Sequence, residues 1–138
     1  MAEAVGNEAR AAGDWVVMGC PNVVRGKSHL GWASAAQMAE AGICRILSSD
    51  YFYPAMLRAA MALVGRGVLD LPSAWQLIST NPAAAVGLSD RGSIAEGLRA
   101  DLVLVDPVVP RVIATIAGGR IAFLTTEGAA RLSLATQA

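Results

Sequence analysis

The sequence predicts an α/β fold followed by a short β segment. Two short apolar runs, at residues 15–19 and 43–47, are rich in β-branched side chains and are typical of parallel strands that are buried on both faces. A helical segment that begins at Ser34 separates these two runs. Beyond Gly87 the chain changes to short apolar segments punctuated by glycine, which indicates β structure.

The first part of the chain predicts a helix, a strand and a long loop. Residues 2–12 have a helical composition, and Gly13 is a typical C-terminal stop. The strand at 15–19 follows. Residues 20–32 contain Pro21 and two glycines, and we expect them to form a loop.

A second helix and strand complete a strand–helix–strand unit. Ser34 and Gln37 have the spacing of a capping box, and Gly42 stands just after the expected helix end. The strand at 43–47 then runs into Ser48-Ser49-Asp50. This order predicts two parallel strands joined by a crossover connection.

Three more helical segments are expected. Pro54 suits the first turn of a helix at 54–65, on which Leu57, Met61 and Val64 form an apolar stripe. Leu71-Pro72 begins a helix through Thr80, and Asn81 is the expected cap of the helix that follows.

The last third of the chain predicts strands and a helical tail. Residues 101–106 read as a strand, and Gly118-Gly119 joins strands at 111–117 and 120–124 in a hairpin. The expected organisation is an α/β part at 1–87, a β segment at 88–124 and a tail at 125–138 with helical character.

Composition excludes several classes of protein. The 138 residues are 54% hydrophobic and 16% charged, which excludes a disordered chain. Eleven basic residues balance eleven acidic ones, so we expect no binding to nucleic acid or to an anionic membrane. Residues 1–10 lack a signal-peptide pattern, and no apolar run reaches the length of a membrane helix. We therefore expect a cytoplasmic protein in which Cys20 and Cys44 are buried, reduced thiols.

Chemically useful side chains follow both predicted strands. Asp50 comes directly after the second strand, and the loop after the first strand carries Arg25, Lys27 and His29. The carboxyl ends of parallel strands share one rim, so these groups would converge there. Asp50 could bind a metal or accept a proton, and Arg25 with Lys27 could hold an anion. The alternatives are a helix cap for Asp50, solvated loop side chains for the others, and a packing role for Tyr51.

The count of histidines limits the metal chemistry. Hydrolytic metal sites usually need several histidine or carboxylate ligands, and this chain has one histidine. One copy of the chain therefore cannot build a site with several histidines.

Four segments of the sequence resemble the amidohydrolase superfamily, and the first two resemble its phosphonate-metabolism branch, the PhnM-type hydrolases. They are MGCPNVVRGKSHLGWAS at 18–34, ILSSDY at 46–51, STNPAAAVGL at 79–88 and DRGSIAEGLRADLVLV at 90–105. The resemblance runs over about residues 8–124. It implies a partial (β/α)₈ barrel that consists of the last two βα units, followed by a short β segment of a composite β-sandwich domain.

The resemblance also implies a chemistry and a set of site residues. The family hydrolyses its substrate with a divalent metal, zinc above all, and its phosphonate branch releases pyrophosphate from ribose 1-methylphosphonate 5-triphosphate. Asp50 matches the aspartate that contacts metal and acts as base for the attacking water. Arg25, Ser28 and His29 match a loop expected near the phosphate chain, and Lys27 stands where the family has a small residue.

The metal-binding histidines of the family have no counterpart in this sequence. We therefore expect the chain alone to bind no metal and to be inactive. Two strands of a barrel would also leave unpaired edges, so we expect a partner, either further copies of the chain or a complementing chain. Two alternatives stay open: a subunit that completes a hydrolase site with another chain, and a self-associating module that binds an anion, such as a phosphate-containing small molecule, through residues 25–29.

Overall fold

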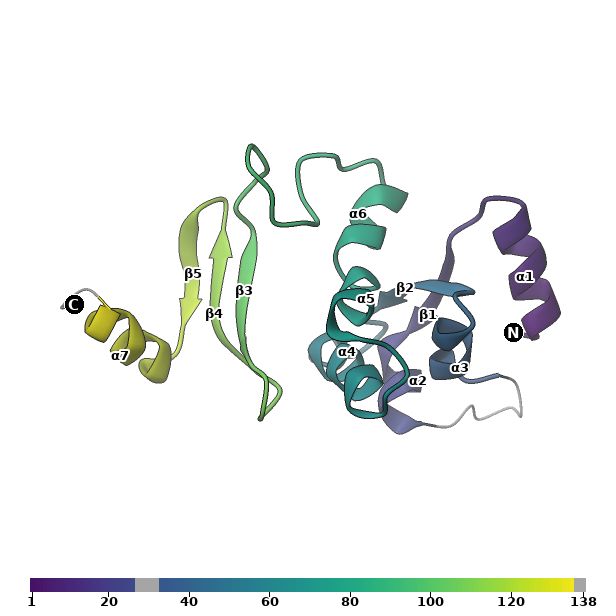
Figure 1. Cartoon of the computed structure of the whole chain (residues 1–138), viewed down its shortest axis with the longest axis horizontal. Helices are drawn as coiled ribbons and strands as arrows, with labels where there is room; N and C mark the ends of the chain where they lie inside the picture. Colours follow the sequence, from purple (N-terminus) through teal and green to yellow (C-terminus); the bar gives the residue numbers. More distant parts are fainter. Residues whose placement is uncertain (27–32, 136–138) are drawn as a thin grey trace. The chain divides into compact units, whose positions relative to one another are not determined.

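The computed structural model describes residues 1–26 and 33–135. The chain forms two compact units, Met1–Gly92 and Ser93–Ala138, and each is described by itself (Figure 1). The sequence pattern predicts a boundary a few residues earlier, after residue 87, and a separate tail at residues 125–138.

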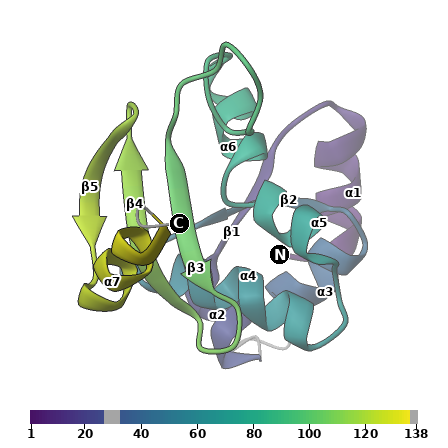
Figure 2. The same ribbon diagram turned by 60° about the vertical axis from the view of Figure 1, so that its left-hand side comes forward.

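The first unit contains the predicted strand–helix–strand arrangement. Its elements, in chain order, are α1 (Glu3–Ala11), β1 (Val16–Gly19), α2 (Cys20–Arg25), α3 (Ala35–Glu40), β2 (Cys44–Ser48), α4 (Ala55–Gly65), α5 (Leu71–Gln76) and α6 (Thr80–Ala85). β1 and β2 lie side by side (Figure 2). They are parallel, with Val16 opposite Cys44 and Gly19 opposite Ser48. The two carboxyl ends therefore lie next to each other, as the sequence predicts.

The edge of β2 that faces away from β1 is covered by the chain around α5 and α6. The amide of Leu47 donates to the carbonyl of Leu77 at 2.8 Å. The side chain of Asn81 donates from Nδ2 to the carbonyl of Arg45, also at 2.8 Å. These bonds satisfy two edge groups that a strand without a neighbour would leave to water.

α2 corrects the first part of the loop predicted at residues 20–32, since residues 20–25 are helical; residues 27–32 lie outside the described residues. Pro21 lies in the first turn of this helix, where its missing N–H costs no hydrogen bond. Gly26 ends the helix in the left-handed conformation, with φ of 75°. Pro21 and Gly26 therefore mark the start and the end of a helix, whereas the sequence pattern predicts that both lie in a loop.

Side-chain caps mark the start of two other helices of this unit, α3 and α5. Ser34 and Gln37 form the predicted capping box at α3. Asp70 accepts from the amide of Ser73 at 2.9 Å and caps α5. Asn81 is not the cap that the sequence predicts, because α6 begins one residue earlier and the Asn81 side chain reaches β2.

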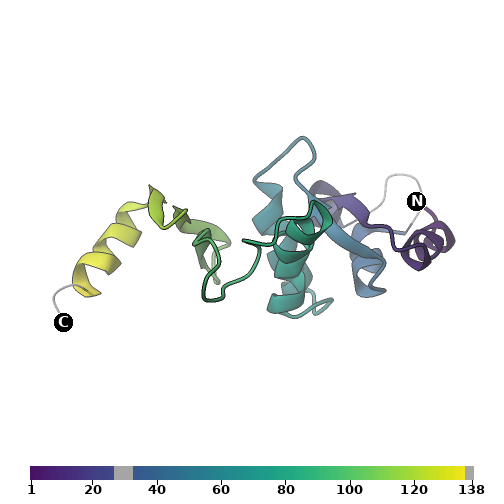
Figure 3. The same cartoon turned by 90° about the horizontal axis from the view of Figure 1, so that it is seen from above.

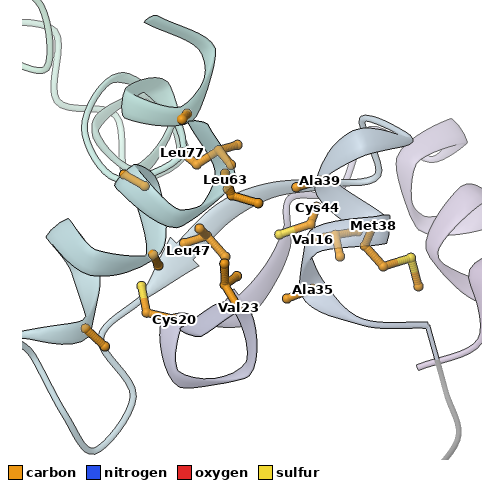
Figure 4. Close-up of a cluster of buried hydrophobic side chains, with 14 of the residues drawn as sticks. Val16, Cys20, Val23, Ala35, Met38, Ala39, Cys44, Leu47, Leu63 and Leu77 are labelled. Carbon is orange, nitrogen blue, oxygen red and sulfur yellow. The ribbon is translucent and has the colours of Figure 1, made fainter. Parts of the chain in front are cut away.

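The core of the first unit lies between the two strands and helices α2, α3, α4 and α5 (Figure 4). Its largest fully buried side chains are Met38, Ile43, Leu47, Leu63, Val23, Cys20 and Cys44. α4 contributes the small residues Ala55, Ala59 and Ala60 together with Leu63. The stripe predicted for this helix, Leu57, Met61 and Val64, is only half buried, because small side chains let the backbone of α4 approach the core.

The carbonyl of Gly92, the last residue of the first unit, is bound to the start of α6. It accepts from Ser79 Oγ at 3.0 Å and from Thr80 Oγ1 at 2.5 Å. A β-carbon at position 92 would lie 2.9 Å from Cβ of Ala83, so this close approach requires glycine.

The second unit is an antiparallel sheet with one helix. Its elements are β3 (Leu102–Asp106), β4 (Arg111–Ala117), β5 (Arg120–Leu124) and α7 (Thr126–Ala135), and the strand order is β3-β4-β5. The predicted Gly118-Gly119 turn joins β4 to β5, and both glycines have positive φ. α7 follows β5 directly and confirms the helical tail (Figure 3).

The two faces of this sheet differ. Leu104, Ala114 and Leu124 share one face, and together with residues of α7 they line a mostly apolar cavity of about 230 Å³. Val103, Thr115 and Phe123 share the opposite face, where Val103 and Phe123 are exposed.

Over residues 1–26 and 33–135, no helix combines the length and the apolar character needed to cross a membrane.

Candidate functional site

The candidate site lies at the carboxyl ends of β1 and β2. Asp50 follows the last residue of β2 by two positions, and Ser48 is paired with Gly19 at the end of β1. Asp50 has φ of 54°, a left-handed conformation that few residues other than glycine adopt. Such conformations cost energy and gather at functional sites.

Gly19 leaves the space that the Asp50 side chain occupies. A β-carbon built at position 19 would lie 2.9 Å from Oδ2 of Asp50 and 3.5 Å from its Cγ. The carboxylate therefore lies across the end of β1, against the backbone of Gly19. No sequence motif pointed to Gly19, although a glycine at the end of a strand is a known sign of close approach.

Arg25 meets Tyr51 at this end of the unit. Its Nη2 donates a hydrogen bond to Oη of Tyr51, and its Cζ lies 5.8 Å from the centre of the tyrosine ring. The sequence suggests a packing role for Tyr51, but 68% of this residue is exposed. Tyr51 is thus a residue of the rim and not of the core.

Arg66 fixes the end of α2, from which Arg25 projects. Its guanidinium donates to the carbonyl of Val23 at 2.9 Å and to that of Val24 at 3.4 Å. Both carbonyls lie in the last turn of α2, where the regular helical hydrogen bonds stop, and the carbonyl of Val23 also accepts from the amide of Gly26 at 3.2 Å. The contact joins α2 to the end of α4, more than forty residues further along the chain.

The structure therefore brings Asp50 and Arg25 to the same end of the strand pair. The other predicted substrate-binding residues, Lys27, Ser28 and His29, lie outside the described residues. Their placement at this site stays a prediction.

Burial keeps the neighbouring thiols protonated. Burial, reinforced by the nearby charges of Cys44 and Asp50, raises the pKa of Cys20 from 9.0 to about 11, against the effect of a backbone hydrogen bond. Burial likewise raises the pKa of Cys44 to about 11. Both cysteines are free and buried. Both thiols are therefore protonated at neutral pH.

The described side chains do not amount to a complete metal site. In the two described ranges, no three His, Cys, Asp or Glu residues gather closely enough to hold a metal ion. Asp50 is a single carboxylate, and a hydrolytic metal ion needs about three protein ligands. What this part of the chain offers is one carboxylate and one guanidinium at a shared rim.

Comparisons with known proteins agree on one family. The model of the amidohydrolase family matches residues 8–128. The chain is 47% identical over 98 residues to the alpha-D-ribose 1-methylphosphonate 5-triphosphate diphosphatase of Escherichia coli (strain K12), a match that covers 70% of this chain and 26% of that protein. It is 48% identical over 67 residues to the adenine deaminase of Methylobacterium sp. (strain 4-46), which covers 48% of this chain and 11% of the deaminase.

A solved structure shows the fold. The beta-aspartyl dipeptidase of Fervidobacterium islandicum AW-1 superposes with a TM-score of 0.66 at 18% identity, covering 89% of this chain and 37% of the dipeptidase. The described α/β arrangement is therefore part of a TIM-barrel-like fold. The chain spans about a quarter of the Escherichia coli relative and a smaller share of the deaminase.

Proposed function

The chain belongs to the amidohydrolase family, and from this membership we propose that residues 1–87 form the last two strand–helix units of a metal-dependent hydrolase and residues 88–124 a short β segment of its second domain. The reaction we propose is release of pyrophosphate from ribose 1-methylphosphonate 5-triphosphate. The hydrolytic centre is completed by residues outside this sequence, so that the chain is inactive by itself. The unpaired thiols of Cys20 and Cys44 agree with a reducing cytoplasm.

The choice of substrate rests on the extent of the match to the Escherichia coli diphosphatase. That match covers 70% of this chain, whereas the match to the adenine deaminase covers 48% at a similar identity. An anionic substrate also agrees with a guanidinium at the rim, because arginine binds phosphate oxygens with two parallel hydrogen bonds.

The observation that carries the proposal is the position of Asp50. It lies at the carboxyl end of β2, with its carboxylate across the end of β1, which is where parallel α/β structures place their functional side chains. We propose that Asp50 accepts the proton of the attacking water. An ionised carboxylate suits that task if a water molecule comes within hydrogen-bond distance.

The amidohydrolase family is generally metal-dependent, and we propose zinc as the metal of the complete enzyme. The residues described here do not suffice to hold it, since no three His, Cys, Asp or Glu side chains gather around a common point in this part of the chain. The remaining ligands must come from other residues of the same enzyme, supplied by a complementing chain or by further copies. A second copy is the weaker source, since each copy brings one histidine.

The test is complementation. The chain is expressed alone and together with the first three quarters of the Escherichia coli diphosphatase, up to the point where the match begins. Pyrophosphate release is measured with ribose 1-methylphosphonate 5-triphosphate, zinc content is measured by elemental analysis, and adenine serves as the alternative substrate.

We expect no zinc and no release from the chain alone, and both from the complex. Asp50→Asn should abolish release without preventing assembly, since an amide keeps the shape of the carboxylate. Stoichiometric zinc with activity in the chain alone would overturn the proposal. So would failure to assemble, a complex without activity, or a complex that acts on adenine only.

A further inference from the structure

We propose that Tyr51 is the positioning residue for Arg25, and that the Arg25–Tyr51 pair holds the phosphate chain of the substrate beside Asp50. The inference rests on the proposed function for the identity of the anion. It adds Tyr51 to the site, a residue for which the sequence suggests a packing role, and it assigns a function to the exposed tyrosine ring.

Two contacts of different kinds orient the guanidinium. The hydrogen bond from Arg25 Nη2 to the hydroxyl of Tyr51 fixes one nitrogen, and the ring lies 5.8 Å from Cζ, within the range of a cation–π contact. A hydrogen bond together with a ring contact restricts the orientation of the guanidinium more than the hydrogen bond would by itself, so the hydroxyl and the ring act together.

The base of the Arg25 side chain is fixed independently. Arg66 binds the carbonyls of Val23 and Val24, and Gly26 ends α2 directly after Arg25. The backbone at Arg25 therefore has little freedom, and the long side chain is what remains to be ordered. Tyr51 orders the far end of that side chain.

Tyr51 also couples Arg25 to Asp50. It is the next residue after Asp50, whose backbone is held in the left-handed region and whose carboxylate lies against Gly19. One short segment thus sets both the carboxylate and, through its tyrosine, the cation. A phosphate group bound at Arg25 is then held at a constant distance from the group that we propose as proton acceptor.

The chemistry of arginine allows both contacts at once. A guanidinium has five N–H donors in a fixed plane, so it can bond to a tyrosine hydroxyl and also present an edge to a phosphate. A lysine at position 25 would keep the charge but lose the planar fork. With the substrate of the proposed function, the ligand at this pair is the phosphate chain of a polyphosphate monoester.

The experiment uses inorganic tripolyphosphate as the probe and the whole 138-residue chain. Binding is measured by calorimetry at constant ionic strength for Tyr51→Phe, Tyr51→Ala and Arg25→Lys. Tyr53→Phe is the matched control, because Tyr53 is a neighbouring tyrosine that is 80% exposed. Thermal unfolding of each variant checks that the fold is kept, which we expect for so exposed a side chain.

We expect Tyr51→Phe to weaken binding about five- to tenfold, as for loss of one charge-assisted hydrogen bond, and Tyr51→Ala and Arg25→Lys to weaken it further. Tyr53→Phe should stay within twofold of the unchanged chain. No binding of tripolyphosphate to the unchanged chain, or equal effects of Tyr51→Phe and Tyr53→Phe, would overturn the inference.

Kinetics of the complemented enzyme separate this inference from the proposed function. Tyr51→Phe should raise KM with kcat kept within about twofold, whereas Asp50→Asn should abolish kcat. An active complex with unchanged KM in Tyr51→Phe would refute the positioning and leave the function standing. Weaker tripolyphosphate binding in Tyr51→Phe, with no hydrolysis by any complex, would refute the function and leave the anion site standing.

Discussion

Gly19 and Asp50 lie so close that the carboxylate of the second occupies the place of a side chain on the first. The distance from a β-carbon at position 19 to Oδ2 of Asp50 would be 2.9 Å, which real β-carbons do not show. The two residues belong to different strand ends that the parallel pairing of β1 and β2 brings together. The position of the candidate base thus depends on a residue that has no functional group.

Gly19→Ala should therefore damage the site more than the fold. The new methyl group pushes the carboxylate aside, and misplacement by about 1 Å can lower a rate about 100-fold. We expect the complemented enzyme to lose about 10- to 100-fold in kcat, with a loss of unfolding free energy of about 1 kcal/mol.

Gly65→Ala is the control for this substitution. Gly65 ends α4, has no atom within 4 Å of its β-carbon position and has no positive φ. Alanine there should raise the unfolding free energy by up to about 1 kcal/mol and leave the rate unchanged. Full activity of Gly19→Ala, or an equal loss in both variants, would contradict the close packing of Gly19 on Asp50.

Ser34→Ala should destabilise the first unit. It removes the side-chain oxygen that accepts from the amide of Gln37 at 3.2 Å, one half of the capping box of α3. The expected cost is about 1 kcal/mol in urea unfolding. Ser34→Asp keeps an acceptor at the same place and should recover most of the loss, whereas equal stability of all three proteins would speak against the cap.

Arg66→Ala should loosen α2 and, through it, Arg25. The variant loses the bonds to the carbonyls of Val23 and Val24, and we expect a stability loss of about 1 kcal/mol because the site is partly solvated. Arg66→Lys can keep one of these bonds and should lose less.

Hydrogen exchange gives the local readout for Arg66. The amides of α2 should exchange faster in Arg66→Ala than in the unchanged chain, while those of α3 stay protected. A uniform change over the whole unit, or no change at α2, would show that Arg66 does not fix this helix.

The two buried thiols predict a loss of stability at high pH. Burial raises the pKa of Cys20 and of Cys44 from 9.0 to about 11, so the folded chain holds these protons more tightly than the unfolded chain. Their contribution is fully present below about pH 9 and is lost as the pH rises toward 11.

Urea unfolding at pH 8, 9.5 and 10.5 measures this dependence. The double variant Cys20→Ala, Cys44→Ala is the reference, because tyrosines also titrate in this range. The unchanged chain should lose more stability over the interval than the double variant. Parallel curves for the two proteins would show that the thiols ionise as easily in the folded state as in the unfolded one.

Much of the secondary structure of both units could be predicted because its signals are local. The strands at β1 and β2 are short apolar runs, and the capping box of α3 spans four consecutive residues. The hairpin of β4 and β5 is marked by two adjacent glycines. Each of these patterns is complete within a few residues, so no tertiary contact is needed to interpret it.

The differences arise where contacts distant in sequence decide. Arg66 donates to the carbonyl of Val23 at the end of α2, although the two residues are 43 positions apart in the sequence. No pattern near residues 20–26 predicts this contact. Asn81 is a residue type that often caps helices, yet its side chain donates to the carbonyl of Arg45, which is 36 residues away in the sequence. Whether a side chain bonds to its own helix end or to a carbonyl distant in sequence depends on packing and cannot be settled from local sequence.

The residues of the candidate site likewise fall into those that the sequence predicts and those that it does not. Asp50 and Arg25 could be named from their positions after two predicted strands. Tyr51 and Gly19 could not, since their effects come from the distance between strand ends and from the absence of a side chain. Positioning residues of this kind carry little chemical signature of their own.

The hydrogen bonds from the hydroxyls of Ser79 and Thr80 to the carbonyl of Gly92 determine where the connection between the two units begins. Gly92 is the last residue of the first unit and is bound to the start of α6, so the connecting segment begins at Ser93. A protease that cuts the chain just beyond that point would leave α6 and the two hydrogen bonds from Ser79 and Thr80 to Gly92 in place.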